Sequence, residues 1–454
     1  MPTAGLSLPA PPFKTPISDL ENFQINTGSS LSVYDPNLRS PYVQQWSFGI
    51  ERALVGNFTL EARYVGNHAV KLYRAYDINE INIFENGFLQ EFLNAQKNLA
   101  ANRGTSFAPG AAGTVPLPLL STLFTGLSAA QGYGSTGFIN NLNLGNVASM
   151  AATLAISPVY ANNRTRLAPN FFRANPNTNQ AIIIGNGSYS HYHALQVEAR
   201  RRFSKGFLFQ ANYTFGKAIT DSEGNFSDFE AYRTLRNLRL DRHRAYYDVT
   251  HNFVGNFIYE LPFGTKRRFW SGGPYLVRKA LEGWQVQGIA TWHSGFATFA
   301  TSGRTTFNNY ATNNPAQLLG MSFAEFKKNI GVYRRPEGTF YFNPDYLNIT
   351  LAPNGQLLTA TLKEGILGAP PPGQFGNFPR NAMNGPTFFQ MDAGVIKRTR
   401  IREVANFEFR AEFFNVFNTV NFGSGSLVFD GTRFGQIQGA YQSRLGQLSL
   451  RVNW

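Results

Sequence analysis

The stretch from Phe407 to Phe413 reads FEFRAEF, with an apolar residue at every odd position and a charged residue at every even one. Because successive side chains of a β-strand point to opposite faces, this period of two separates the rings from the charges. The same alternation recurs in FLFQANYTF (207–215), FTLEARY (58–64) and LSLRVNW (448–454). The pattern predicts strands with one apolar and one polar face.

Nine such strands are predicted, at 42–53, 57–67, 190–203, 206–219, 247–262, 283–296, 388–398, 403–417 and 444–454. Many exceed the usual length of a soluble strand and can cross a bilayer at a tilt. The connections alternate between a shorter set (54–56, 204–205, 263–282, 399–402) and a longer set (68–189, 220–246, 297–387, 418–443). Outer-membrane barrels have short periplasmic turns and long extracellular loops. We therefore predict an all-β fold, an antiparallel transmembrane β-barrel of which about nine to ten long strands are present here.

The longest connections, 68–189 and 297–387, are expected to be surface loops, the first with a helix near 88–102. Residues 1–41 are expected to be the remainder of a further extracellular loop, so that 1–454 forms the C-terminal part of a barrel. Because the last strand descends to the periplasm, nine strands place Met1 outside the cell. We expect the chain to begin inside a loop of a longer protein, which agrees with the lack of a signal-peptide pattern at its start.

The composition excludes several classes of protein. There is no Cys, so disulfides and thiolate chemistry are impossible. The most apolar stretch, Leu117 to Ala130, is too short for a transmembrane helix. The net charge of +14 fits an anionic partner or a solvated surface, and charge alone does not choose between them.

Two tryptophans give a length for the apolar face. Trp284 and Trp292 are eight residues apart and share a face. Eight residues span roughly 26 Å, which a tilt of about 40° reduces to about 20 Å, close to the apolar band of a barrel. We predict that Trp46, Trp284 and Trp292 belong to aromatic girdles; the alternative is core tryptophans in a soluble sheet.

The densest basic run lies in the connection 220–246 and consists of Arg233, Arg236, Arg239, Arg242 and Arg244. Arginine forks suit phosphate oxygens, so this run is a candidate contact for an anionic ligand or for lipopolysaccharide. The alternative is a loop that is ion-paired to its acidic neighbours Asp228, Glu230 and Asp241. Nucleic-acid binding is not expected, because the predicted aromatic and charged faces are opposite.

No catalytic, cofactor or metal site is predicted. His191 and His193 share a strand face and could bind a metal, but no third ligand is evident. Neither a nucleophile elbow nor a phosphate-binding glycine loop is present. We expect a protein that is not an enzyme and needs no cofactor.

Several short sequence motifs resemble those in the C-terminal barrel of TonB-dependent receptor-like proteins, in particular the Oar-like group. They are SPYVQQWSFG (40–49), YHALQV (192–197), RRFSKG (201–206), YELPFG (259–264), GWQ (283–285) and FRAEFFNVFN (409–418). The resemblance implies a 22-stranded barrel with an internal plug, energised by an inner-membrane complex through a TonB box. We find neither plug nor TonB box in this chain.

The resemblance implies a bacterial outer-membrane transporter for a bulky solute, surrounded by lipid and lipopolysaccharide. It would reach the TonB complex through N-terminal parts absent here. The alternatives are an Oar-like structural or adhesion protein and a soluble β-sandwich that binds glycans. The final strand resembles the signal that the barrel-assembly machinery reads, carried by Leu448, Leu450, Val452 and Trp454.

Overall fold

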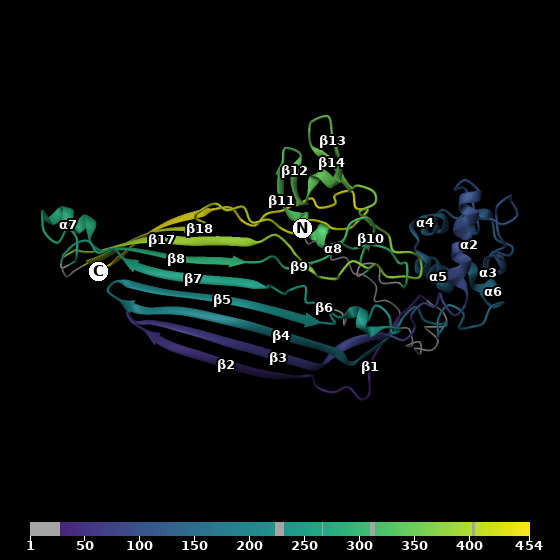
Figure 1. Ribbon diagram of the computed structural model, residues 1–454, viewed down its shortest axis with the longest axis horizontal. Coiled ribbons are helices and arrows are strands. Elements are labelled where there is room, and N and C mark those ends of the chain that lie inside the picture. Colours follow the sequence, from purple (N-terminus) through teal and green to yellow (C-terminus); the bar gives the residue numbers. More distant parts are fainter. Residues whose placement is uncertain (1–27, 223–230, 266, 309–313, 402–404) are drawn as a thin grey trace, which may run out of the picture. The chain divides into compact units, whose positions relative to one another are not determined.

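A computed structural model describes residues 28–222, 231–265, 267–308, 314–401 and 405–454 (Figure 1). The acidic neighbours Asp228 and Glu230 lie outside the described residues. By internal contacts the chain divides into two units. Of the described residues, those within 28–36, 75–184 and 307–308 form the first unit, and those within 37–74, 185–306 and 314–454 form the second.

The main sheet is a meander in which consecutive long strands are neighbours (Figure 1). Their order is β2-β3-β4-β5-β7-β8-β17-β18-β19. The registers of β2 with β3 and of each neighbouring pair from β4 to β19 are antiparallel. The strands are β2 (Tyr42–Leu54), β3 (Phe58–Asp77), β4 (Ala181–Ser204), β5 (Phe207–Thr220), β7 (His251–Glu260), β8 (Trp284–His293), β17 (Phe388–Ile401), β18 (Ala405–Phe414) and β19 (Leu445–Asn453). All nine predicted strands are confirmed.

Two boundaries and two additional strands depart from the prediction. Strand β3 continues to Asp77 and β4 begins at Ala181, so both reach well into the expected loop 68–189. Strand β1 (Leu31–Tyr34) pairs with β4 in a parallel register, which the alternation did not predict. Strand β6 (His243–Arg244) adds a short antiparallel pairing to β5.

Tight turns join the strands at one end of the sheet. Lys205 and Gly206 both have positive φ, 51° and 78°, as the two-residue turn between β4 and β5 requires. Gly56 and Asn57, in the turn between β2 and β3, also have positive φ, 80° and 65°. The longer connection from β7 to β8 at this end contains helix α7 (Tyr275–Leu281). We call this end of the sheet the short-turn end and the other the long-loop end.

The connection from β3 to β4 contains a helical body with its own core. Its helices are α2 (Phe88–Ala101), α3 (Pro118–Leu123), α4 (Thr136–Leu144), α5 (Val147–Ile156) and α6 (Ala161–Arg164), with 3-10 turns η1 (Ala129–Gln131) and η2 (Pro158–Tyr160). The predicted helix near 88–102 is therefore confirmed as α2, and the rest of the segment is more ordered than a surface loop. Its buried core includes Phe88, Phe92, Leu120, Phe138 and Leu154. We call residues 78–180 the helical insert.

The connection from β8 to β17 also folds on itself. It contains helix α8 (Phe323–Lys328), the 3-10 turn η5 (Pro344–Tyr346) and the strands β9 (Ala297–Thr298), β10 (Gln317–Leu318), β11 (Ile330–Arg335), β12 (Gly338–Phe342), β13 (Leu347–Leu351), β14 (Leu357–Leu362), β15 (Leu367–Gly368) and β16 (Met383–Asn384). Small hairpins such as β11–β12 and β13–β14 pack around buried Phe326, Phe340 and Phe342, and the β18–β19 connection adds Phe434. A 3-10 turn η3 (Leu238–Asp241) lies between β5 and β6.

The described helices are short. None of them combines the length and the apolar character that a membrane-spanning helix needs.

Candidate functional site

One face of the sheet carries most of the aromatic residues of the long strands, and we call it the aromatic face. Directly opposed residues of an antiparallel pair share a face, so the registers follow this face from strand to strand: Phe209 opposes Phe257, and Phe253 opposes Trp292. A hydrogen bond of 2.7 Å between Tyr64 and His193 continues it from β3 to β4. The face bears the residues predicted for it: Phe58, Leu60, Tyr64, Phe209, Tyr213, Trp284, Trp292, Phe407, Phe409 and Leu450.

The aromatic face is open over much of its area. Phe48 on β2 is 70% exposed, and Ile50, Leu60, Phe215 and Leu448 are also exposed. A soluble protein rarely leaves so much contiguous apolar surface uncovered. The arrangement suits a face whose solvent is hydrocarbon.

The three predicted girdle tryptophans all lie on this face. Trp284 and Trp292 stand at opposite ends of β8, and the indole of Trp284 donates a 2.8 Å hydrogen bond to the carbonyl of Ala280. Trp46 opposes Gly66, where an added Cβ would lie 2.4 Å from the indole nitrogen. Gly66 therefore lets the Trp46 ring lie close to the sheet.

The opposite face, which we call the polar face, carries a ladder of ion pairs. Arg200 on β4 contacts Glu51 on β2 at 3.1 Å, and Arg398 on β17 contacts Glu408 on β18 at 2.7 Å. Gln447 on β19 donates to Glu412 at 2.8 Å. A small hollow of about 190 Å³ is lined by polar side chains of three strands, namely Glu61, Arg63, Gln196, Glu198, Asn212 and Thr214. The polar face thus offers fixed, water-accessible charges.

A buried charge cluster lies among the segments at the long-loop end. Asp241 is fully buried and is approached by three guanidinium groups: Arg233 at 3.1 Å, Arg380 at 3.4 Å and Arg74 at 3.5 Å. Arg380 and Asp241 are 139 positions apart in the sequence. No local pattern reveals such a pairing, so sequence analysis did not find Arg74 or Arg380.

The predicted arginine run separates into two groups. Arg233 belongs to the buried cluster, and Arg244 pairs with Asp248 at 2.9 Å. Arg236, Arg239 and Arg242 are exposed. Burial raises the pKa of Asp248, while the amide of Ala218 and the guanidinium of Arg244 oppose that rise. Of the predicted run, Arg236, Arg239 and Arg242 are therefore the arginines accessible to a large ligand.

The histidines come together differently from the prediction. His68, which the sequence leaves isolated, stacks on His191 with ring centroids 4.2 Å apart and nearly parallel planes. His193 instead bonds to Tyr64. Among the described residues no group of three or more His, Asp or Glu side chains is arranged to hold a metal ion.

The C-terminal strand forms one edge of the sheet. Leu448, Leu450 and Val452 lie on the aromatic face and oppose Ala411, Phe409 and Phe407, and the side chain of Trp454 is 93% exposed. Within the described residues β19 pairs only with β18, and β2 only with β3. The barrel is therefore open between these two edges.

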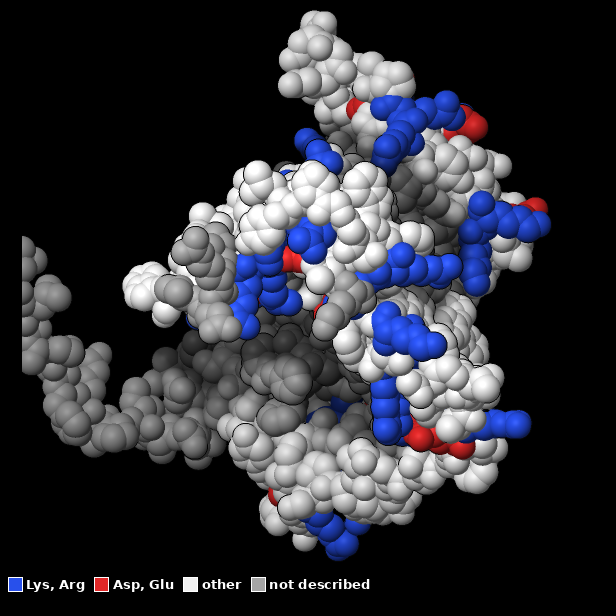
Figure 2. All heavy atoms as spheres, turned by 90° about the vertical axis from the view of Figure 1, so that its left-hand side faces the viewer, with Lys and Arg blue, Asp and Glu red and all other residues white. Residues whose placement is uncertain are grey.

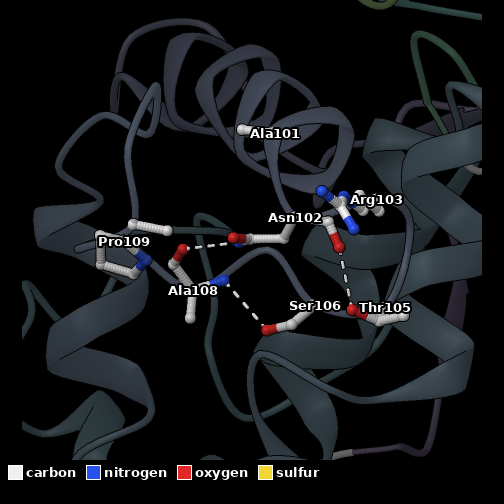
Figure 3. Close-up of a pocket in the computed structure, with 8 residues that line it drawn as sticks. Ala101, Asn102, Arg103, Thr105, Ser106, Ala108 and Pro109 are labelled. Carbon is white, nitrogen blue, oxygen red and sulfur yellow. Dashed lines mark hydrogen bonds between the residues drawn. The ribbon is translucent and has the colours of Figure 1, made fainter.

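The helical insert has surface hollows that the sequence did not indicate. One, of about 310 Å³, lies at the C-terminal end of α2 and is lined by eight residues between Ala101 and Ala111 (Figure 3). Its polar groups bond to one another: Asn102 donates to the carbonyl of Ala108 at 2.9 Å, and the amide of Ala108 donates to Ser106 at 3.2 Å. These internal bonds fix the loop and do not point to a ligand.

Comparison with known proteins identifies the family to which the chain belongs. The family described as outer membrane beta barrel domain matches residues 2–447. The comparison with curated proteins found no match. Among solved structures, the outer membrane transporter YddB from Escherichia coli has a TM-score of 0.37 at 8% identity, covering 93% of this chain and 34% of its own. A variant of the ferric enterobactin receptor PfeA from Pseudomonas aeruginosa has a TM-score of 0.34 at 8% identity, covering 95% and 36%.

This chain thus spans about a third of the length of those two structures. The family match covers nearly all of it. The chain therefore belongs to the outer membrane beta barrel domain family, and the protein is an all-β barrel protein of the bacterial outer membrane.

Proposed function

We propose that the chain is the C-terminal part of the barrel of a TonB-dependent receptor of the Oar-like group, which imports a bulky solute with energy from the TonB complex. The observation that supports this most is the polar face. A wall that is apolar outside and charged inside encloses an aqueous lumen, and barrels of many strands have lumens wide enough for a large solute.

The ion pairs of the polar face fit a lumen lining. The contacts of Arg200 with Glu51 and of Arg398 with Glu408 join neighbouring parts of the wall at half-exposed side chains. Exposed pairs of this kind contribute little stability, so they cost little to exchange for a polar solute. Within this proposal the chain itself catalyses no reaction, because these charges pair with one another across strands.

A second candidate, adhesion or envelope organisation, is favoured by the helical insert. Residues 78–180 carry a core of their own, which a simple loop does not need. A rigid body on a long connection offers a surface for a macromolecular partner. The third alternative, a soluble glycan-binding sandwich, is wrong, since the protein belongs to an outer-membrane family and its aromatic face is open.

The test compares a strain that carries the native gene with a deletion strain. Mass spectrometry of the spent medium identifies solutes that only the first strain removes. For the receptor, we expect this removal to stop when a protonophore collapses the inner-membrane gradient. Identical media from both strains, combined with weaker attachment of the deletion strain to surfaces, would favour adhesion and contradict transport.

Assembly by the barrel-assembly machinery is part of the same proposal. An unpaired strand edge is intolerable in hydrocarbon, so the terminal strand must find a partner during insertion. Strand β19 has alternating apolar residues on the aromatic face and ends beside the exposed Trp454. We propose that this strand is the part which the machinery recognises.

A further inference from the structure

The connection between β7 and β8, at the short-turn end, exposes several large apolar side chains. All described residues from 265 to 277 are exposed. Leu276 is 77% and Trp270 63% exposed, and Phe269, Tyr275 and Val277 are exposed beside them. Trp270 also has a left-handed backbone (φ 54°), a conformation that a bulky residue adopts at a cost. A segment that exposes large apolar side chains, and holds one of them in an unfavourable backbone conformation, is expected to be covered by a binding partner.

Contacts at its C-terminal end turn α7 toward the aromatic face. Trp284 and Lys397 oppose each other on that face, at the short-turn end of β8 and β17. The indole of Trp284 donates to the carbonyl of Ala280, and the ammonium of Lys397 donates to the carbonyls of Lys279 (2.7 Å) and Glu282. Both donors come from the lipid-facing side of the wall. The helix is therefore tied to the outside of the barrel and not to its lumen.

The segment is also strongly basic. Residues 261–283 contain five Lys or Arg and one acidic residue. Lys279 pairs with Glu282 at 2.7 Å, and Arg267 with Glu260 at 2.8 Å. Figure 2 views this end of the sheet and shows many Lys and Arg side chains with few Asp and Glu. The surface is complementary to an anionic one.

We propose that residues 267–279, with α7, bind the anionic phospholipid headgroups of the membrane leaflet that meets the short-turn end. Short turns of outer-membrane barrels face the periplasm, so this leaflet is the inner one. The partner is a lipid surface and not a protein because the segment continues the lipid-facing wall: its anchors, Trp284 and Lys397, belong to the aromatic face.

Each part of the segment has a place in this binding. Tyr275, Leu276 and Val277 would enter the boundary between headgroups and acyl chains, as the apolar side of an interfacial helix does. Arg267, Arg268 and Lys279 would contact phosphate oxygens, and Trp270 would lie at headgroup depth. Surface pairs such as Arg267–Glu260 exchange for a phosphate at little cost.

The test uses quenching of tryptophan fluorescence by brominated lipids. The complete protein is reconstituted in nanodiscs that contain either brominated phosphatidylglycerol or brominated phosphatidylcholine. The difference between the protein and its Trp270→Phe variant isolates the signal of Trp270 from the other four tryptophans. We expect the anionic lipid to quench Trp270 more strongly than the zwitterionic one at equal mole fraction.

The charge variant Arg267→Gln/Arg268→Gln/Lys279→Gln should lower the relative binding constant for phosphatidylglycerol, by about fivefold for each basic residue removed. The control Arg334→Gln/Arg335→Gln removes two exposed charges from β11, in a connection at the long-loop end, and should leave the preference unchanged. Heat-modifiable gel mobility confirms that each variant is folded. Equal quenching by both lipids, a preference that survives in the triple variant, or no quenching of Trp270 by either lipid would overturn the proposal; the last result would mean that the segment stands away from the bilayer.

Discussion

The helical insert and the aromatic face use the same kinds of apolar residue in opposite ways. In the insert Phe88, Phe92 and Phe138 are buried within a protein core. On the sheet Phe48 and Leu448 remain exposed. The two regions differ in what surrounds them: water outside the insert and hydrocarbon against the sheet. An apolar residue is thus stabilised by its neighbours in one region and by its solvent in the other.

The largest expected effect comes from emptying the insert's core. Phe88→Ala should destabilise the insert by about 3–5 kcal/mol, because a fully buried ring is removed and leaves a cavity. The ring also packs edge-on against Phe172, with centroids 5.3 Å apart. Limited proteolysis of intact cells that express the native protein should show faster cleavage within 78–180. The control Phe48→Ala removes an exposed ring and should leave that cleavage rate unchanged.

The next effect comes from placing a charge on the aromatic face. Ala393 on β17 opposes Gly288, which lies midway between Trp284 and Trp292. Ala393→Arg should destabilise the folded barrel by about 2–4 kcal/mol, the cost of an arginine at the bilayer midplane. Gln287→Arg, next to Gly288 but on the polar face, should cost far less. Urea titration followed by heat-modifiable mobility measures both, and equal losses would mean that the two faces have been assigned wrongly.

A smaller effect is expected at the edge of the sheet. Trp454→Ala should slow the appearance of the folded, heat-modifiable band in outer-membrane fractions, because β19 would be recognised less well before its edge is paired. Val55, in the turn after β2, is 96% exposed but lies outside the terminal strand, and so Val55→Ala is the matched control. Pulse-chase labelling gives the rate. An unchanged rate for Trp454→Ala would leave this residue as a girdle residue only.

The smallest effect is a pH dependence of the insert. Burial raises the pKa of Glu91 above its ordinary value of 4.5, although the amides of Leu120 and Leu119 oppose this. A carboxyl whose pKa is raised by folding binds protons more tightly in the folded state, so its contribution is fully present below pH 4.5 and is lost as the pH rises through the folded pKa. Proteolytic resistance of the insert should therefore fall over that range in the native protein. Glu91→Gln keeps an acceptor for the Leu120 amide, 3.0 Å away, and should flatten the profile; a profile that stays the same would exclude Glu91 as its origin.

The strands were predictable because the evidence for them is local. Alternation such as FEFRAEF ties each side chain to a face through the pleat alone, whatever the strand pairs with. The turn predicted at 204–205 lies one residue later, at Lys205–Gly206, and the strand predicted at 283–296 is β8 (Trp284–His293). The extra length of β3 and β4 was not predictable, since Gly66 and His68 stand at positions of β3 where the pattern expects large apolar residues.

The helical insert was underestimated for a physical reason. Its helices have between 4 and 14 residues, and isolated helices of that length are marginal in water. They are stabilised by contacts between distant segments, such as the 3.0 Å bond from the Leu120 amide to Glu91. Composition alone, rich in Asn, Gly and Ala, therefore suggested a loop.

By itself the sequence determined the nine strands, the two faces and the alternation of short and long connections, because the pleat and the turns act over a few residues. Only the tertiary structure decided which charges are buried around Asp241, that His68 stacks on His191, and that α7 is tied to the aromatic face through Lys397. Those arrangements join residues far apart in the chain. Their interaction energies depend on the distance between the groups and on their burial, and a local sequence pattern specifies neither.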